Sequence, residues 1–179
     1  MIKRYMVRPW AERFNWIVVN TGMQCMKFAA DRMLGKLARW LRLMGHDVIY
    51  GPHLCGYGLI RAARQEDRLI LTRDRRFKQK QPPTFLFVES DHYREQLRQV
   101  IRACNLDPLA RAFTRCAECN AELQPRAKAA VERLVPPYVF SSQERFFGCP
   151  ECGRIYWRAT HHERIREELR RISIPDSGN

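Results

Sequence analysis

Four cysteines in the second half of the chain have the spacing of a metal site. Cys116 and Cys119 form one C-x-x-C pair, and Cys149 and Cys152 form a second pair that is followed by a glycine. Two such pairs separated by a loop are typical of zinc sites, because each makes a tight turn that presents two thiolates to one ion. Four thiolates complete a tetrahedral shell, so the ion would be structural rather than catalytic. We predict Zn²⁺ bound by these cysteines, with redox-active thiol pairs as the alternative.

Two aspartates follow apolar runs that we predict to be strands. Asp31 comes directly after the run at 26–30, and Asp74 closely follows Leu69–Thr72. The carboxyl ends of parallel strands meet at one edge of a sheet, where α/β proteins place their sites. Carboxylates at that edge can hold Mg²⁺ or Mn²⁺, which activate water and stabilise charge on a phosphoryl group. We predict that both are catalytic metal ligands, although each precedes a predicted helix and could serve only as its N-cap.

A third acidic position follows the next predicted strand. Glu89 and Asp91 come after the apolar run Phe85–Val88, at the same expected edge of the sheet. A metal-dependent hydrolase commonly gathers several carboxylates around its ion, because divalent cations prefer hard oxygen ligands. We therefore include Asp91 with the candidate catalytic residues.

Basic side chains surround the predicted acidic site in two groups. One group shares a face of a predicted helix by its i, i+4, i+7 spacing, and the other flanks the second aspartate. An acidic centre with basic residues around it suits a metal-dependent nuclease, since its substrate is a polyanion. A solvated helix face is the alternative for the first group. The candidate nucleic-acid-binding residues are Arg32, Lys36, Arg39, Arg73, Arg75 and Arg76.

The charge of the whole chain favours a polyanionic partner. Its 179 residues include 32 Lys+Arg against 19 Asp+Glu, a formal net charge of +13. Such a balance indicates nucleic acid or an anionic membrane surface. No apolar run reaches the ~20 residues that cross a bilayer, and the start of the chain lacks a signal-peptide core. We expect a cytoplasmic protein that binds nucleic acid and no membrane.

The elements that would position these residues alternate between strands and helices. Near-continuous apolar strands separated by amphipathic helices predict an α/β fold with a parallel sheet. The predicted strands cover 26–30, 46–50, 69–72 and 85–88, and the predicted helices cover 34–44, 59–65 and 93–104.

Changes in pattern divide the chain into four parts. Residues 1–25 match nothing that follows, and we expect an N-terminal extension without fixed structure; an upstream element or a wrongly chosen start are alternatives. Residues 26–108 form the predicted α/β domain, and 109–165 form a small zinc ribbon around the four cysteines. Metal binding would supply much of the folding free energy of so small a domain. Residues 166–179 are a C-terminal tail or helix.

Several of these motifs occur together in a typical order. The run from Asp31 to Asp47 is followed by Leu69–Asp74, the first cysteine pair, Val135–Pro137 and Cys149–Trp157. This order resembles the Mut-seven C-terminal ribonuclease domain family over roughly residues 26–165. The resemblance implies a PIN-like three-layer α/β domain followed by a zinc ribbon. It also implies metal-dependent cleavage of RNA with Asp31 and Asp74 as metal-binding acids, and it allows a homodimer.

The sequence departs from the family pattern at one place. The resemblance implies an acidic pair at the start of the helix before Leu69–Asp74, and the matching stretch Leu54–Leu59 contains no carboxylate. Three functions stay open: a metal-dependent ribonuclease, an RNA-binding protein of the same fold that cleaves weakly or not at all, and a non-catalytic protein-interaction module. Close approach of Asp31, Asp74 and a third carboxylate favours the first, whereas a large exposed apolar patch favours the third.

Overall fold

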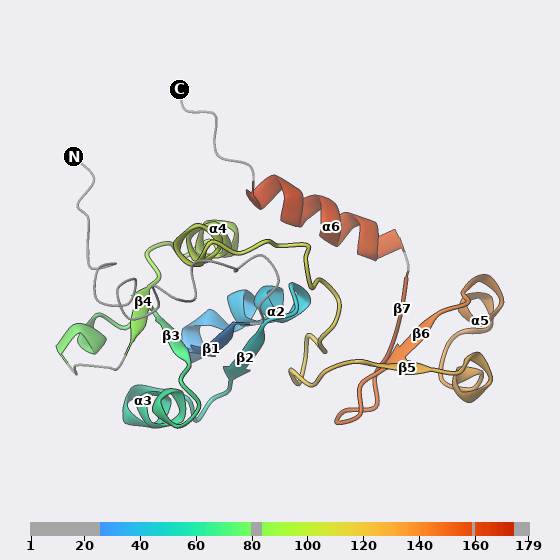
Figure 1. The fold of residues 1–179 in the computed structure, drawn as a ribbon, viewed down its shortest axis with the longest axis horizontal. Helices are drawn as coiled ribbons and strands as arrows, with labels where there is room; N and C mark the ends of the chain where they lie inside the picture. Colours follow the sequence, from blue (N-terminus) through green and yellow to red (C-terminus); the bar gives the residue numbers. More distant parts are fainter. Residues whose placement is uncertain (1–25, 80–83, 159, 174–179) are drawn as a thin grey trace.

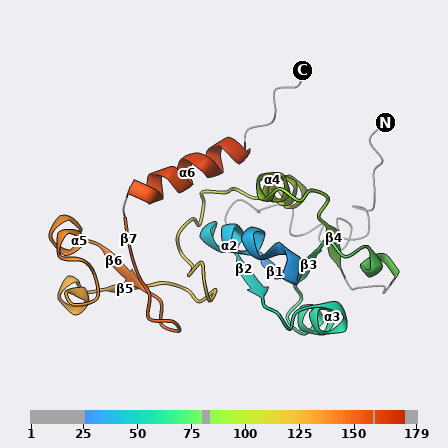
Figure 2. The ribbon, with the colours of Figure 1, turned by 180° about the vertical axis from the view of Figure 1, so that it is seen from behind.

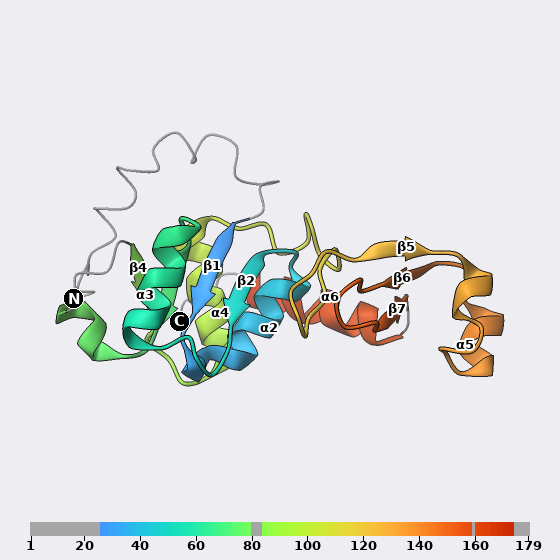
Figure 3. The ribbon, with the colours of Figure 1, turned by 90° about the horizontal axis from the view of Figure 1, so that it is seen from below.

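The computed structural model describes residues 26–79, 84–158 and 160–173. It contains an α/β part with a parallel sheet and a smaller part with an antiparallel sheet, which extends to one side (Figures 1 and 3). The extension predicted at 1–25 and the last six residues lie outside the described residues.

The parallel sheet has four strands in the order β2-β1-β3-β4. Its central strand β1 pairs with β2 on one side and β3 on the other, so that Ala29 lies opposite both Ile49 and Ile70. All four predicted strands are present, within one residue at either end. The strands are β1 (Lys27–Ala30), β2 (Asp47–Tyr50), β3 (Leu69–Thr72) and β4 (Phe85–Phe87).

Helices cover both faces of this sheet, as predicted (Figures 1 and 2). Alternate residues of the buried strands point to opposite faces. Phe28 and Leu71 belong to the core beneath α2 (Gly35–Leu43) and α4 (Tyr93–Cys104), whereas Ala29 and Ile70 pack under α3 (Gly56–Gln65). None of the described helices has the length and apolarity needed to cross a membrane.

The smaller part is a three-stranded antiparallel sheet, in the order β5-β6-β7, with its own core. Its buried side chains come from the loop and short helix between β5 and β6 and from the strands themselves. They are Val131, Val135, Val139 and Phe146. The elements are β5 (Gln124–Arg126), α5 (Pro137–Ser142), β6 (Phe146–Gly148) and β7 (Ile155–Trp157).

The last helix, α6 (Thr160–Ser173), returns to the α/β part and packs on α4. Leu169 and Ile172 are buried in the core under α2 and α4. Arg98 of α4 donates a hydrogen bond to the carbonyl of Ile172 at 3.2 Å. The boundary expected after residue 165 therefore falls inside this helix, because its apolar stripe completes the core of the first part rather than the ribbon.

Candidate functional site

Asp31 and Asp74 are linked through Thr72 at the carboxyl ends of two neighbouring strands. The Thr72 hydroxyl donates a hydrogen bond to Asp31 Oδ2 at 2.8 Å and accepts one from the backbone N–H of Asp74 at 3.0 Å. The backbone N–H of Asp31 donates to the carbonyl of Leu71 at 2.9 Å, which continues the β1–β3 pairing. Sequence reasoning named both aspartates and missed Thr72, although a hydroxyl residue ending the strand before Asp74 was the available signal.

The strand order places this pair at a topological switch point. From β1 the chain first adds β2 on one side, and it then adds β3 on the other. The connections that leave β1 and β3 therefore diverge, and open α/β sheets bind ligands in the crevice at such a point. The pair occupies the position in this fold where a ligand is expected.

Both aspartates also cap the short helices that follow them. Asp31 Oδ1 accepts a hydrogen bond from the N–H of Met33 at 3.2 Å, and Asp74 Oδ1 accepts one from the N–H of Arg76 at 2.9 Å. The capping role considered from the sequence is therefore present. It leaves room for further partners, since an ionised carboxylate offers about four acceptor sites.

A basic side chain already lies against this acidic pair. Arg76 Nε contacts both carboxylate oxygens of Asp74, at 2.9 and 3.2 Å. This hydrogen bonding, the charge of Asp74 and the charge of Asp31 raise the pKa of the Arg76 guanidinium. The Arg76 side chain is 78 % exposed and Arg75 beside it is also exposed, so a ligand entering from solvent meets both.

Asp91 does not join the pair in a three-acid cluster. Its side chain is 75 % exposed and forms an ion pair with Arg73. The first turn of α3 contains no acidic residue either. Within the described ranges, the cysteines are the one group of three or more His, Cys, Asp or Glu side chains close enough to hold a metal ion together. Among the described residues, no third carboxylate therefore joins Asp31 and Asp74 in a metal-binding group.

The predicted basic face of the first helix begins at this site and leads away from it. Arg32 follows Asp31 directly, and the Lys36 ammonium lies over the Tyr93 ring at 3.9 Å from its centroid. Arg39 forms an ion pair with Glu118, at 3.0 Å, beside the first cysteine pair. This helix face thus extends from the acidic pair toward the ribbon.

The four predicted zinc ligands lie together at one end of the ribbon. The Sγ atoms of Cys116, Cys119, Cys149 and Cys152 lie within 4.8 Å of one another. The Cys116–Cys152 distance is 3.6 Å and the Cys119–Cys149 distance is 3.2 Å. Four sulfurs at about 2.3 Å from a tetrahedral ion lie about 3.8 Å apart, so the group fits a metal such as zinc.

Both cysteine pairs have the same local geometry. Asn120 follows the first pair with φ +77° and Gly153 follows the second with φ +72°, the left-handed conformation that closes each turn. Burial opposes ionisation of Cys116, but hydrogen bonds from the Cys119 backbone and the Tyr156 hydroxyl outweigh it and lower the pKa of this thiol to about 6. Cys116 therefore favours the thiolate form that binds metal, whereas burial and hydrogen bonds with the neighbouring thiols raise the pKa of Cys119 and of Cys152.

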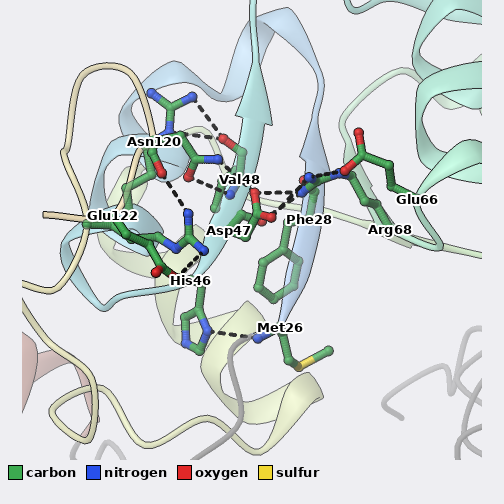
Figure 4. A network of polar contacts seen from close by, with 11 residues as sticks. Met26, Phe28, His46, Asp47, Val48, Glu66, Arg68, Asn120 and Glu122 are labelled. Atoms are coloured by element: carbon green, nitrogen blue, oxygen red, sulfur yellow. Dashed lines mark hydrogen bonds and ion pairs between the residues drawn. The ribbon is translucent and has the colours of Figure 1, made fainter. Parts of the chain in front are cut away.

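The first cysteine turn is fixed to the edge strand β2 (Figure 4). The Asn120 side chain donates to Asp47 Oδ1 at 2.7 Å and accepts from the N–H of Val48 at 2.9 Å. Arg42 of α2 is buried and donates to the carbonyls of Val48, Ala117 and Glu118. The ribbon thus docks at the amino end of the sheet, opposite the edge that carries the acidic pair.

A buried ion pair between Arg68 and Asp47 holds the carboxylate that Asn120 contacts. Arg68 donates to both oxygens of Asp47, at 2.8 and 3.0 Å, and its side chain is 4 % exposed. Burial acts to raise the pKa of Asp47, but the hydrogen bonds from Arg68 and Asn120 outweigh it and leave the pKa below its ordinary value. Asp47 is therefore held as a carboxylate between the two parts of the protein.

The fold and these residues define a class: a three-layer parallel α/β domain with an acidic pair at its switch point, joined to a ribbon with a four-cysteine site. A scan against family models matches the Mut7-C RNAse domain over residues 26–169, so the chain belongs to this family. The match includes both parts and most of α6. No curated protein matches the chain.

Proposed function

We propose that this protein is a metal-dependent ribonuclease that hydrolyses RNA phosphodiester bonds at Asp31 and Asp74. The observation that carries the proposal is the Thr72-linked acidic pair at the switch point of a Mut7-C RNAse domain. The net charge of +13 supports a polyanionic substrate.

Two carboxylates are a sufficient protein contribution for the expected ion. Asp31 and Asp74 would hold Mg²⁺ or Mn²⁺, because Mg²⁺ is commonly bound through one or two carboxylates while water and substrate phosphate fill its other positions. When bound, such an ion activates water for attack and neutralises phosphate charge. The site therefore does not need Asp91 as a ligand.

The other residues of the site have separate tasks in this proposal. The Thr72 hydroxyl orients the carboxylate of Asp31, which is 4 % exposed and has little freedom. When the substrate binds, the exposed guanidinium of Arg76 releases its hydrogen bonds to Asp74 and donates hydrogen bonds to the substrate phosphate instead. Arg73 and Arg75 add positive charge beside the scissile bond, where charge develops in the transition state.

We also propose that the cysteine site holds Zn²⁺ in a structural role. Its four sulfur ligands leave no open position for a substrate. The ion would hold the first cysteine turn, which contacts β2, to the second cysteine turn.

A second candidate function is RNA binding by the same fold without efficient cleavage. The first turn of α3 lacks the acidic pair that the family pattern implies, and Arg76 already neutralises Asp74. Either feature would weaken divalent metal binding while leaving the basic surface intact.

Cleavage of an RNA panel separates the two functions. Purified zinc-loaded protein is incubated with single-stranded and structured RNAs in Mn²⁺, in Mg²⁺, or without either ion. The double variant Asp31→Asn/Asp74→Asn is compared with Asp67→Asn/Glu132→Gln, which removes two exposed carboxylates far from the site.

The ribonuclease proposal expects metal-dependent cutting by wild type and the control, with loss in the double variant. Salt-sensitive binding of RNA without cutting would instead support the second candidate. Cutting by the double variant at the wild-type rate would refute the assignment of the site.

A further inference from the structure

A large cleft lies between the ribbon and the α/β part. It has a volume of about 1060 Å³ and is lined by the end of α2, the segment 112–118, strands β6 and β7, and the beginning of α6. Figure 3 shows β6 and β7 in the ribbon, which extends to one side of the α/β part that contains α2. Because the ribbon docks on β2 through Asn120 and Asp47, at the amino end of the sheet, the cleft is separate from the acidic pair.

The charge of the cleft is strongly positive. Six arginines and one carboxylate, Glu118, contribute to its walls. Three of the arginines are ion-paired with glutamates, whereas the guanidinium groups of Arg145, Arg154 and Arg166 form no ion pair within the described part of the chain. These three guanidinium groups are available to an anionic ligand, and their planar shape suits phosphate.

Aromatic side chains are interleaved with these arginines. Phe147 of β6 and Tyr156 of β7 lie directly opposite each other in the ribbon and line the cleft together with Trp157. Phe147 is 39 % exposed. On the facing wall, the Phe113 ring stacks on His162 with 3.8 Å between centroids. Phe147 is the exposed ring of this group, and Phe113, Tyr156 and Trp157 are half-buried. Accessible rings between cationic groups are typical of surfaces on which unpaired bases stack.

We propose that this cleft binds single-stranded RNA, with the bases on the aromatic rings and the phosphates on Arg145, Arg154 and Arg166. A single strand is favoured over a duplex because paired bases do not expose their faces for stacking. An acidic peptide would match the charge but would leave the aromatic rings without planar partners. The inference goes beyond cleavage at Asp31 and Asp74, since binding here requires neither carboxylate.

Fluorescence anisotropy of a labelled 12-nucleotide oligouridylate tests this site. The full chain is used with zinc bound and without Mg²⁺ or Mn²⁺, so that binding is measured apart from cleavage. Arg154→Gln/Arg166→Gln is compared with Arg61→Gln/Arg64→Gln, which removes two exposed charges from α3. We expect the cleft variant to raise the Kd at least tenfold and to lower the slope of log Kd against log salt by about 1.4, or about 0.7 per phosphate.

The aromatic contribution is measured separately. Phe147→Ala should raise the Kd about tenfold and leave the salt slope unchanged, because stacking carries no charge. Phe147→Tyr should bind as wild type. Because Phe147 is partly exposed, its replacement should leave the fold intact. The two Phe147 variants therefore still test the proposal if Arg154→Gln/Arg166→Gln loses its thermal transition or its zinc.

Three outcomes would overturn the proposal. They are equal losses in the cleft and α3 variants, equal affinity for the oligouridylate and an RNA duplex, and displacement of the RNA by a lower concentration of polyglutamate than of unlabelled RNA. Loss of cleavage by Asp31→Asn/Asp74→Asn tests the proposed function alone, because neither residue lines the cleft. Failure of cleavage and failure of the cleft are therefore distinguishable.

Discussion

The hydroxyl of Thr72 holds the two candidate catalytic aspartates in one arrangement. It donates to Asp31 and accepts from the backbone of Asp74, and Thr72 is fully buried. A buried hydroxyl with both hydrogen bonds satisfied has a single favourable position. The Asp31 carboxylate and the Asp74 backbone are therefore both positioned by a residue that carries no charge.

Replacement of this hydroxyl tests its role directly. Thr72→Val should lower the free energy of unfolding by about 1–3 kcal/mol, because it leaves Asp31 Oδ2 and the Asp74 N–H without their partner. Cleavage should fall about 10–100-fold as the carboxylates lose alignment. Thr72→Ser retains the hydroxyl and should retain most activity. Urea unfolding and initial rates measure both effects, and a Val variant as active as the Ser variant would contradict them.

Asp47 gives the protein a stability that depends on pH. Its pKa is lowered in the folded state, so its contribution is present above the ordinary value of 3.8 and is lost as the pH falls through the folded value. Asp47→Asn should cost about 1–3 kcal/mol at pH 7, since Arg68 then loses one of its two carboxylate partners and retains Glu66. The cost should shrink as the pH approaches 3.

Urea unfolding of wild type and Asp47→Asn between pH 7 and pH 3 measures this difference. Asp67→Asn is the control, because Asp67 is exposed and lies outside this ion pair, and it should change the free energy of unfolding by less than about 0.5 kcal/mol at pH 7. A cost for Asp47→Asn that does not change down to pH 3 would contradict the role of the ion pair.

At the scale of single residues, the sequence indicates which charged residues belong to the site better than it indicates which residues they contact. Asp31 and Asp74 could be placed because each follows a recognisable apolar strand, and the cysteines because of their spacing. Thr72 as a bridge and Arg76 as a partner depend on contacts between β1 and β3 that no local pattern records. Asp91 lies after a strand as expected, yet its carboxylate turns to Arg73.

At the scale of elements, the turn after α2 depends on one glycine. Gly45 has φ +87°, and a Cβ atom there would lie 2.2 Å from the carbonyl oxygen of Arg111. Gly45→Ala should lower the free energy of unfolding by about 2–4 kcal/mol through backbone strain and this clash. Gly51→Ala is the control, because Gly51 has open space around it, and it should change stability by less than about 0.5 kcal/mol. Equal thermal stability of the two variants would contradict this account.

The ribbon should depend on its metal. Cys116→Ser should abolish bound zinc and lower the melting temperature, because the small core of the ribbon cannot replace the ion. Cys55→Ser removes an exposed thiol outside the cluster and should keep one zinc per chain. Elemental analysis measures the zinc content. Full zinc in the Cys116 variant would refute the site.

Strands and helices could be predicted from the sequence where a single hydrophobic pattern, either an apolar run or helical spacing, dominates a segment. The four strands and the helices between them follow from apolar runs and helical spacing, so their bounds agree closely. The role of α6 could not be predicted, because its apolar stripe is short and its partner α4 lies far away in the sequence. The contact of Asn120 with β2 was equally hidden, since it joins residues more than seventy positions apart.

At the scale of the whole molecule, two candidate sites lie at opposite ends of one sheet. The acidic pair lies at the carboxyl ends of β1 and β3, and the ribbon with its basic cleft docks at the amino end of β2. Helix α2 runs between them, from the acidic site to Arg42 at the ribbon contact. Its basic face connects the proposed binding cleft with the proposed site of cleavage.

The most direct measurement is the initial rate of RNA cleavage in Mn²⁺ by wild type and by Asp31→Asn. Asp31→Asn is nearly isosteric, and its single carbonyl oxygen can accept a hydrogen bond from either Met33 N–H or the Thr72 hydroxyl, which donate to different oxygens of Asp31. Loss of a metal ligand at the reacting phosphate should slow cleavage by about 10²–10³-fold, while zinc content and RNA affinity stay at wild-type values. Equal rates in the two proteins, or no cleavage by wild type in any metal, would contradict the account.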